Sequence, residues 1–219
     1  MIKIEDSKKV WITSDSHYGH KNICRGVTSW RMPDGSIPVD QTRPFDTINK
    51  MNETIIKNIN DNVGQDDVLI HLGDWSFGGY ENIREFWDRL ICKNIHLVLG
   101  NHDHHIESNR DGVRGLFKSV SFYNEMSYMG QTIVLMHYPI TSWNGLRKGR
   151  IHIHGHCHLP PNKKISGGGR RIDCGFDGHP EFRPYDLHRE IIVPMLKLPI
   201  GSELGGADHH TDKMKNVIG

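Results

Sequence analysis

The sequence predicts an α/β protein whose first half forms a parallel sheet and whose second half is richer in strands. Up to about residue 100, short apolar runs alternate with longer amphipathic stretches. This alternation predicts two consecutive strand–helix–strand units with right-handed crossovers. Beyond that point short apolar runs follow one another with only turns between them, which favours antiparallel or mixed strand pairing.

In the first half we expect three buried strands separated by two helices. The strands are expected at Val10–Thr13, Val68–Leu72 and Ile95–Leu99. The helices are expected over Ile48–Ile59 and Ile83–Ile91, where apolar residues recur with the i, i+3, i+4 spacing of one helix face.

In the second half the apolar runs predict five further strands. We expect them at Ser119–Tyr123, Thr132–Met136, Arg150–His154, Arg170–Cys174 and Glu190–Val193. A hairpin connection is expected at 129–131, where Gly130 follows Met129.

Two segments show no periodicity. Residues 25–46 hold three prolines and two glycines, and a loop of this length is usually functional. The polar, glycine-rich residues 201–219 are expected to form a flexible tail. We therefore expect one domain over residues 1–200, with an insertion at about 25–46.

Composition excludes several classes of protein. The 27 basic residues nearly balance the 26 acidic ones, which argues against a protein that coats nucleic acid. No apolar run approaches the length of a membrane span. Four widely spaced cysteines without a C-x-x-C pair, and an N-terminus without a signal-peptide core, favour a cytoplasmic protein. The 16 histidines are unusual and indicate that the fold uses imidazole.

Residues of metal-binding type gather directly after the predicted strands. Ligand sites in α/β sheets form beyond the carboxyl ends of the strands, so we expect these residues to converge. The candidates are Asp15, His17, Asp74, Asn101, His137, His156 and His158.

The chemistry of this set predicts two metal ions. Carboxylate, amide and imidazole ligands without a thiolate set suit Mn, Fe, Zn or Ni better than Ca. Seven candidates exceed what one tetrahedral zinc accepts. We therefore expect two divalent transition-metal ions that share a bridging carboxylate, with Mn as the first choice.

The order of these motifs resembles the calcineurin-like metallophosphoesterase superfamily. The motifs are Asp-x-His at Asp15, Gly-Asp at Gly73, Gly-Asn-His-Asp at Gly100, a histidine at His137 and Gly-His-x-His at Gly155. Residues 15–23 further resemble small bacterial and phage members. The resemblance implies an α/β fold, a four-layer α-β-β-α sandwich with two mixed sheets packed face to face.

The resemblance also implies a role for each ligand. Asp15, His17 and His158 would hold the first ion; Asn101, His137 and His156 would hold the second. Asp74 would bridge the ions, and a hydroxide shared by them would be the nucleophile. His102 would act as the catalytic acid that protonates the leaving oxygen.

The second motif departs from the protein serine/threonine phosphatases of this superfamily. Phe77 replaces the carboxylate that pairs with the acid histidine, and Gly78 replaces the arginine that grips phosphate. A guanidinium from Arg25, Arg43 or Arg147 would have to take over that task. The residues expected to bind substrate are Asn101, His20, Arg25 and Arg43.

The expected function is a metal-dependent phosphoesterase that favours phosphodiester or nucleotide-like substrates. A phosphomonoesterase is the first alternative, followed by a nuclease and a non-catalytic scaffold. The expected partner is a small or nucleotide-like phosphate ester, without a membrane or a stable nucleic-acid partner. Cys157, between two candidate ligands, is expected to be a small buried thiol.

Overall fold

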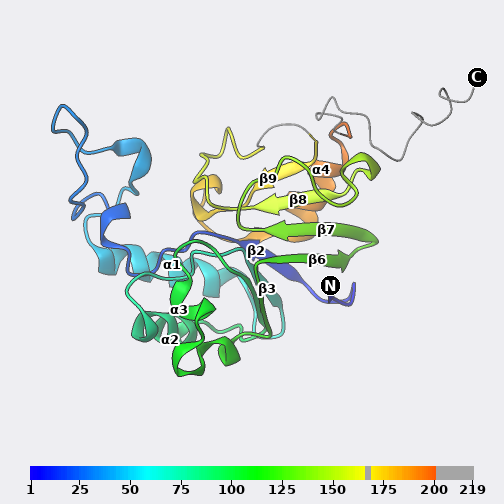
Figure 1. The fold of residues 1–219 in the computed structure, drawn as a ribbon, viewed down its shortest axis with the longest axis horizontal. Coiled ribbons are helices and arrows are strands. Elements are labelled where there is room, and N and C mark those ends of the chain that lie inside the picture. Colours follow the sequence, from blue (N-terminus) through cyan, green and yellow to red (C-terminus); the bar gives the residue numbers. More distant parts are fainter. Residues whose placement is uncertain (166–168, 201–219) are drawn as a thin grey trace, which may run out of the picture.

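Two five-stranded sheets packed face to face form the body of the protein, as seen in the computed structural model, which describes residues 1–165 and 169–200 (Figure 1). Both sheets mix parallel and antiparallel pairs. The predicted α/β fold with two mixed sheets is therefore confirmed. The tail predicted over residues 201–219 lies outside the described residues.

The first sheet carries the parallel core that the sequence predicts. Its order is β10 (Tyr185–Asp186), β2 (Val10–Thr13), β3 (Val68–His71), β4 (Ile95–Val98) and β5 (Ser119–Ser121). Strands β2 to β5 run parallel, and only β10 is antiparallel to its neighbour. The carboxyl ends of β2, β3 and β4 consequently lie at one edge of the sheet, where the loops that follow them meet.

The second sheet has the order β1 (Ile2–Lys3), β6 (Tyr123–Tyr128), β7 (Gln131–Met136), β8 (Ile151–His154) and β9 (Arg171–Asp173). Strands β6 and β7 form the expected hairpin, and Tyr128 pairs with Gln131. Both turn residues have positive φ, 51° at Met129 and 69° at Gly130. This backbone belongs to the tight turn that matches the twist of the strands.

Helices α1 (Ile48–Asn62) and α2 (Tyr80–Arg89) cover the outer face of the first sheet. Thr47 caps α1 by accepting a hydrogen bond from the Lys50 N–H, which satisfies one of the free donors at the helix start. The shorter helices are α3 (His104–Glu107), η1 (Lys21–Ile23), η2 (Val39–Gln41), η3 (Arg110–Leu116), η4 (Leu146–Lys148), η5 (Phe176–Gly178), η6 (Leu187–Ile192) and α4 (Val193–Leu196).

Alternating side chains of the first sheet divide the core. Trp11 and Leu69 point to the helices, whereas Ile12 and Ile70 point to the second sheet. This is the period of two expected of strands whose faces are both covered. The outer face of the second sheet has a thinner cover, built around Val134, Trp143 and Leu146.

Two strand predictions need correction, and strands β1, β6 and β10 were not predicted. Glu190–Val193 is not a strand, because it spans the end of η6 and the start of α4, where Ile191 and Ile192 pack into the core. A short apolar run fits a buried helix as well as a strand, so periodicity alone does not separate them. The strand predicted at Ser119–Tyr123 ends at Ser121, and the chain crosses to the second sheet at Phe122. Strands β1 and β10, only two residues each, carry no sequence period.

The loop 25–46 projects from the body and is drawn in blue at the left of Figure 1. Backbone hydrogen bonds close its base, from the Arg25 N–H to Arg43 O and from the Gly26 N–H to Phe45 O. Among all the residues that the structure describes, no helix is both long enough and apolar enough to cross a membrane.

Candidate metal centre

All seven candidate ligands meet at one end of the sandwich, although they come from five separate segments. Asp15 and His17 follow β2, Asp74 follows β3 and Asn101 follows β4. From the second sheet, His137 follows β7, and His156 and His158 follow β8. The two sheets are joined here, because the His156 N–H donates to both carboxylate oxygens of Asp15.

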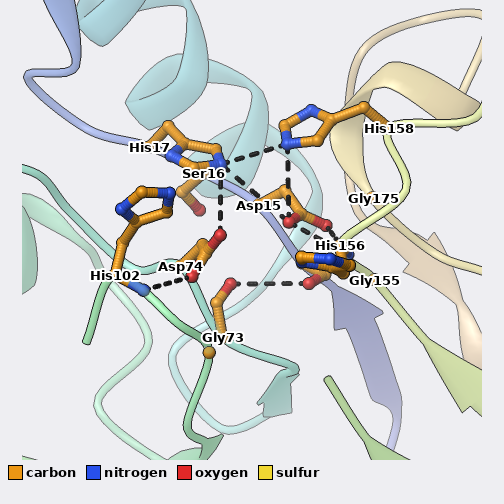
Figure 2. A network of polar contacts seen from close by, with 12 residues as sticks. Asp15, Ser16, His17, Gly73, Asp74, His102, Gly155, His156, His158 and Gly175 are labelled. Carbon is orange, nitrogen blue, oxygen red and sulfur yellow. Dashed lines mark hydrogen bonds and ion pairs between the residues drawn. The ribbon is translucent and has the colours of Figure 1, made fainter. Parts of the chain in front are cut away.

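The first group of donors consists of Asp15, His17 and His158 (Figure 2). The Nε2 atoms of His17 and His158 face each other at 3.1 Å. Asp15 Oδ1 lies 3.9 Å from His17 Nε2 and 3.7 Å from His158 Nε2. The three atoms therefore surround one point, as ligands of a single ion do.

The second group consists of Asn101, His137 and His156. Asn101 Oδ1 lies 3.1 Å from His137 Nε2 and 2.9 Å from His156 Nδ1. An amide oxygen and two imidazole nitrogens thus converge on a second point.

Asp74 connects the two groups. Its Oδ2 atom lies 3.4 Å from His17 Nε2 and 3.6 Å from His137 Nε2. Metal–ligand bonds of about 2.0–2.2 Å place neighbouring ligand atoms about 3–3.5 Å apart, so both donor groups fit a divalent ion. The donor set of this chain therefore suits the metal ions that the sequence predicts.

The backbone of the ligand loops is held in an uncommon conformation. Nine non-glycine residues have positive φ in residues 1–165 and 169–200, and five of them are candidate ligands: Asp15, His17, Asp74, His156 and His158. Such backbone costs free energy and persists where the surrounding structure enforces it, most often at functional sites. The uncommon backbone therefore marks five of the seven residues that the sequence motifs mark.

Two glycines allow the ligand loops to touch. A Cβ atom on Gly73 would lie 2.4 Å from the backbone nitrogen of Gly100. One on Gly100 would lie 2.3 Å from Asp74 Oδ1. Glycine before Asp74 and Asn101 thus permits the close approach that the sequence predicts.

Neighbouring groups fix the orientation of two ligand histidines. The Nδ1–H of His137 donates to Leu72 O at 2.7 Å, and that of His158 donates to Asp177 Oδ2 at 2.7 Å. When each ring is neutral, this donation leaves Nε2 unprotonated toward the centre, which is the tautomer that binds metal. Asp103 holds the loops themselves, because its carboxylate accepts from the N–H groups of Asp74, Trp75 and Gly100.

Burial and neighbouring charged groups shift the pKa values of several residues in the site. Burial lowers the pKa of His17, and the neighbouring His158 lowers it further. Burial raises the pKa of Asp74, and the facing Asp15 adds to the rise. Burial would lower the pKa of His158, but Asp15 and Asp177 outweigh it and raise that pKa to about 9. The carboxylates of Asp15 and Asp177 thus favour positive charge at this point of the centre.

Arg43, predicted to bind substrate, lines the cavity beside the metal centre, but most of its guanidinium contacts are with the protein itself. It is 2% exposed, and its guanidinium forms two hydrogen bonds with the Asp177 carboxylate and donates to Asp15 O and Ser16 O. Four of its five N–H donors are thereby used. Arg43 consequently positions the first ligand loop and the carboxylate that orients His158.

Arg25 also lies apart from the predicted role. Its guanidinium donates to Val39 O and to Thr42 O and Oγ1, which ties the projecting loop together. It is not among the residues that line the cavity beside the metal centre.

His102 and His20 lie together beside the first donor group. The ring centroids of His102 and His17 are 5.3 Å apart, and the His102 N–H donates to Asp74 Oδ1 (Figure 2). His20 stacks on Phe77 at 4.1 Å. Burial, followed by the charge of His102, lowers the pKa of His20 to about 4.

A cavity of about 690 Å³ opens from this group toward the projecting loop. His17, His102 and His158 line it on the side of the metal centre. Its size lies within the range of about 300–1,000 Å³ that small-molecule sites occupy. Loop 25–46 contributes Trp30, Asp40, Gln41, Thr42 and Arg43 to the lining of this cavity.

Sequence reasoning missed two carboxylates that support the ligands. Asp103 closes the Gly-Asn-His-Asp motif, and that position could have been its signal. Asp177 has no comparable local signal, because its partners Arg43 and His158 are remote in the chain.

The prediction that Cys157 is a buried thiol is wrong. Cys157 is exposed, since it lies in the turn between two candidate ligands.

Comparisons with known proteins agree with this geometry. A family model described as calcineurin-like phosphoesterase matches residues 8–189. A Gene 66 protein of Mycobacterium phage D29 is 27% identical over 209 residues, covering 84% of this chain and 95% of the phage protein. An uncharacterised protein of Methanocaldococcus jannaschii is 29% identical over 153 residues, covering 69% of this chain and 70% of the relative.

One solved structure shares the fold. A protein of unknown function from Aquifex aeolicus superposes with a TM-score of 0.52 at 22% identity, covering 81% of this chain and 95% of its own. The match of the family model extends over most of the described chain and includes every candidate ligand. The chain therefore belongs to the calcineurin-like phosphoesterase family, and it is a metal-dependent hydrolase of phosphate esters.

Proposed function

We propose that the protein hydrolyses phosphodiesters or nucleotide-like phosphate esters with two divalent ions, Mn first among them. The observation that carries the proposal is the position of Asp74, whose Oδ2 lies between His17 Nε2 and His137 Nε2. One buried carboxylate thereby joins two complete donor groups. Asp15, His17 and His158 would hold one ion; Asn101, His137 and His156 would hold the other.

Two ions at these positions would supply Lewis acidity, activate water for attack and balance the charge of the phosphate. Side chains of the protein would donate the proton to the leaving group and contact the phosphate. His102 lines the cavity next to His17 and can donate a proton to a leaving oxygen there. Asn101 lies on the exposed side of the centre and offers its amide to the phosphate.

The proposed preference for diesters rests on the residues that would surround the phosphate group of the substrate. Gly78 stands where an arginine would grip a doubly charged monoester, and the guanidinium of Arg43 is occupied. The cavity beside His102 offers room for a second ester group. The complete ligand set argues against a non-catalytic scaffold.

A phosphomonoesterase is the second candidate, because Lys163 lines the same cavity and can meet the extra charge of a monoester. The expected cytoplasmic location stays a prediction.

Hydrolysis of p-nitrophenyl phosphate and of bis(p-nitrophenyl) phosphate under Mn, Ni, Zn and Mg tests the proposal. We expect a higher kcat/KM for the diester and two metal ions per chain by atomic emission. A large preference for the monoester would reverse the order of the substrates. One ion per chain at full activity would contradict the two-metal site.

A further inference from the structure

The cavity beside the metal centre has two unlike sides. The inner side consists of the ligand and acid histidines, which are held by hydrogen bonds and burial. The outer side comes from the projecting loop and from the segment after the last ligand. Its exposed members are Trp30, Asp40, Gln41, Pro160 and Lys163.

Trp30 gives the outer side an open aromatic ring. Its side chain is 37% exposed although it lines a cavity, and its ring meets His20 edge-on at a centroid distance of 6.0 Å. His20 in turn lies flat against Phe77. The aromatic group therefore begins at the acid histidine and ends in a tryptophan that is partly exposed.

Polar groups on the same side have unused hydrogen-bonding capacity. Within the described residues, the side chains of Asp40, Gln41 and Lys163 form no hydrogen bond or ion pair of their own. Gln41 can both donate and accept, Asp40 accepts and Lys163 donates. A ligand that fills this cavity would thus meet one flat ring and a set of free polar groups.

We propose that this cavity binds the base of a nucleotide-like substrate, with the base stacked on Trp30 and its polar edge toward Asp40 and Gln41. The inference rests on the proposed function, since the phosphate is taken to lie at the metal centre. A nucleobase combines a flat ring with donors and acceptors at its edge, and stacking on aromatic side chains accepts every base. Lys163 would balance charge on the phosphate side of the nucleoside.

Other ligands of similar size fit the lining less well. An acyl chain would leave the three polar side chains without partners, which costs free energy. A phosphotyrosine side chain would stack on Trp30 but has no edge that pairs with Gln41. Phosphotyrosine is therefore included as a competing probe.

The test compares ligands that differ only in the base. AMP and ribose 5-phosphate are measured as competitive inhibitors of methyl p-nitrophenyl phosphate hydrolysis by the Mn-loaded protein, with O-phosphotyrosine as third probe. The variants are Trp30→Ala, Trp30→Phe and, as a matched control, Phe122→Ala, which removes an exposed aromatic ring outside the cavity.

We expect AMP to bind at least about tenfold more tightly than ribose 5-phosphate, the scale of one stacked base. Trp30→Ala should remove most of that ratio, Trp30→Phe should keep most of it, and Phe122→Ala should leave it unchanged. Equal binding of AMP and ribose 5-phosphate, or an unchanged ratio in Trp30→Ala, would overturn the inference. So would tighter binding of O-phosphotyrosine than of AMP.

Calorimetry with the same probes separates this inference from the proposed function. If the protein hydrolyses none of the phosphate esters, the proposed function fails, yet the dissociation constants of AMP and ribose 5-phosphate still decide the base site. If hydrolysis is found and the two constants are equal, the base site alone fails.

Discussion

The metal centre and the outer side of its cavity lie next to each other but are built differently. At the metal centre Asp15, His17 and Asp74 are buried, and their backbone is held at positive φ. On the outer side Trp30 and Gln41 are exposed, and Gln41 makes no side-chain hydrogen bond within the described residues. The difference separates a centre that is held by burial and backbone contacts from an outer side whose polar side chains are open to solvent.

Arg43 joins the two regions. It belongs to the projecting loop, yet its guanidinium reaches the backbone of the first ligand loop and the carboxylate of Asp177. The loop can therefore vary at its outer residues without disturbing the centre, as long as Arg43 stays in place. Substitutions in the two regions test this separation, beginning with the largest expected effect.

Asp74→Asn should abolish turnover and reduce the bound metal below two ions per chain, because an amide cannot bridge two cations with a negative oxygen. Steady-state rates and atomic emission measure both effects. Asp40→Asn is the matched control: it makes the same change in the exposed wall and should keep the metal content. Full activity of Asp74→Asn with two bound ions would contradict a shared carboxylate.

His102→Ala should keep both ions and lower kcat by about 10²–10⁴-fold, the usual contribution of a general acid. The loss should be greatest for esters with poor leaving groups, which need the proton most. His104→Ala removes a neighbouring exposed histidine and should have little effect. A fall in metal content in His102→Ala would show that this ring is a ligand instead.

Arg43→Met should destabilise the protein by about 3–5 kcal/mol, because it removes a buried guanidinium and leaves the partly buried Asp177 carboxylate with His158 alone. Loss of the support for His158 should also weaken metal binding about 10–100-fold. Arg25→Met should change stability by no more than about 1 kcal/mol, since Arg25 is only half-buried and contacts the loop alone.

Chemical unfolding and metal titration distinguish this role from the one predicted by the sequence. If Arg43 bound substrate, Arg43→Met would raise KM and leave stability and metal affinity unchanged. Arg43→Lys keeps a charge without the paired contacts and should fall between the two, which covers the case in which the methionine variant does not fold.

Glu190→Gln should have the smallest effect, and an effect that depends on pH. Burial alone would raise the pKa of Glu190, but hydrogen bonds from Arg183 and from the Asp186 N–H outweigh it and lower the pKa to about 2. A lowered pKa means that the stabilisation is complete above the ordinary value of 4.5 and is lost as the pH falls toward 2.

The Tm of Glu190→Gln should therefore lie at most about 2–4 °C below that of the unaltered protein at pH 7. That difference should shrink between pH 4.5 and pH 3. Glu181→Gln alters an exposed partner of the same arginine and serves as the control. A difference in Tm that grows with acidification would contradict a lowered pKa of Glu190 in the folded protein.

Sequence patterns predicted most of the first sheet and the ligand set. The strands at Val10–Thr13, Val68–His71 and Ile95–Val98 were recognisable because each is a short apolar run that ends at a polar or glycine-rich turn. Helix α2 begins three residues before the predicted start, at Tyr80, because Gly79 with a φ of 95° begins the turn that leads into it. Glu190–Val193 was mistaken for a strand although it lies in the helical segment 187–196. Four apolar or long side chains in a row have no period that separates a helix from a strand.

By itself the sequence determined which residues gather at the candidate metal centre, because carboxylate, amide and imidazole side chains follow strands that end at the same side of their sheets. Only the tertiary structure decided what holds them. Arg43 and Asp177 pair across 134 residues, and no local pattern predicts a contact over that distance. Their pairing gives Arg43 a part in supporting the metal centre that the sequence did not predict, because a buried guanidinium is fixed by the carboxylate that neutralises it.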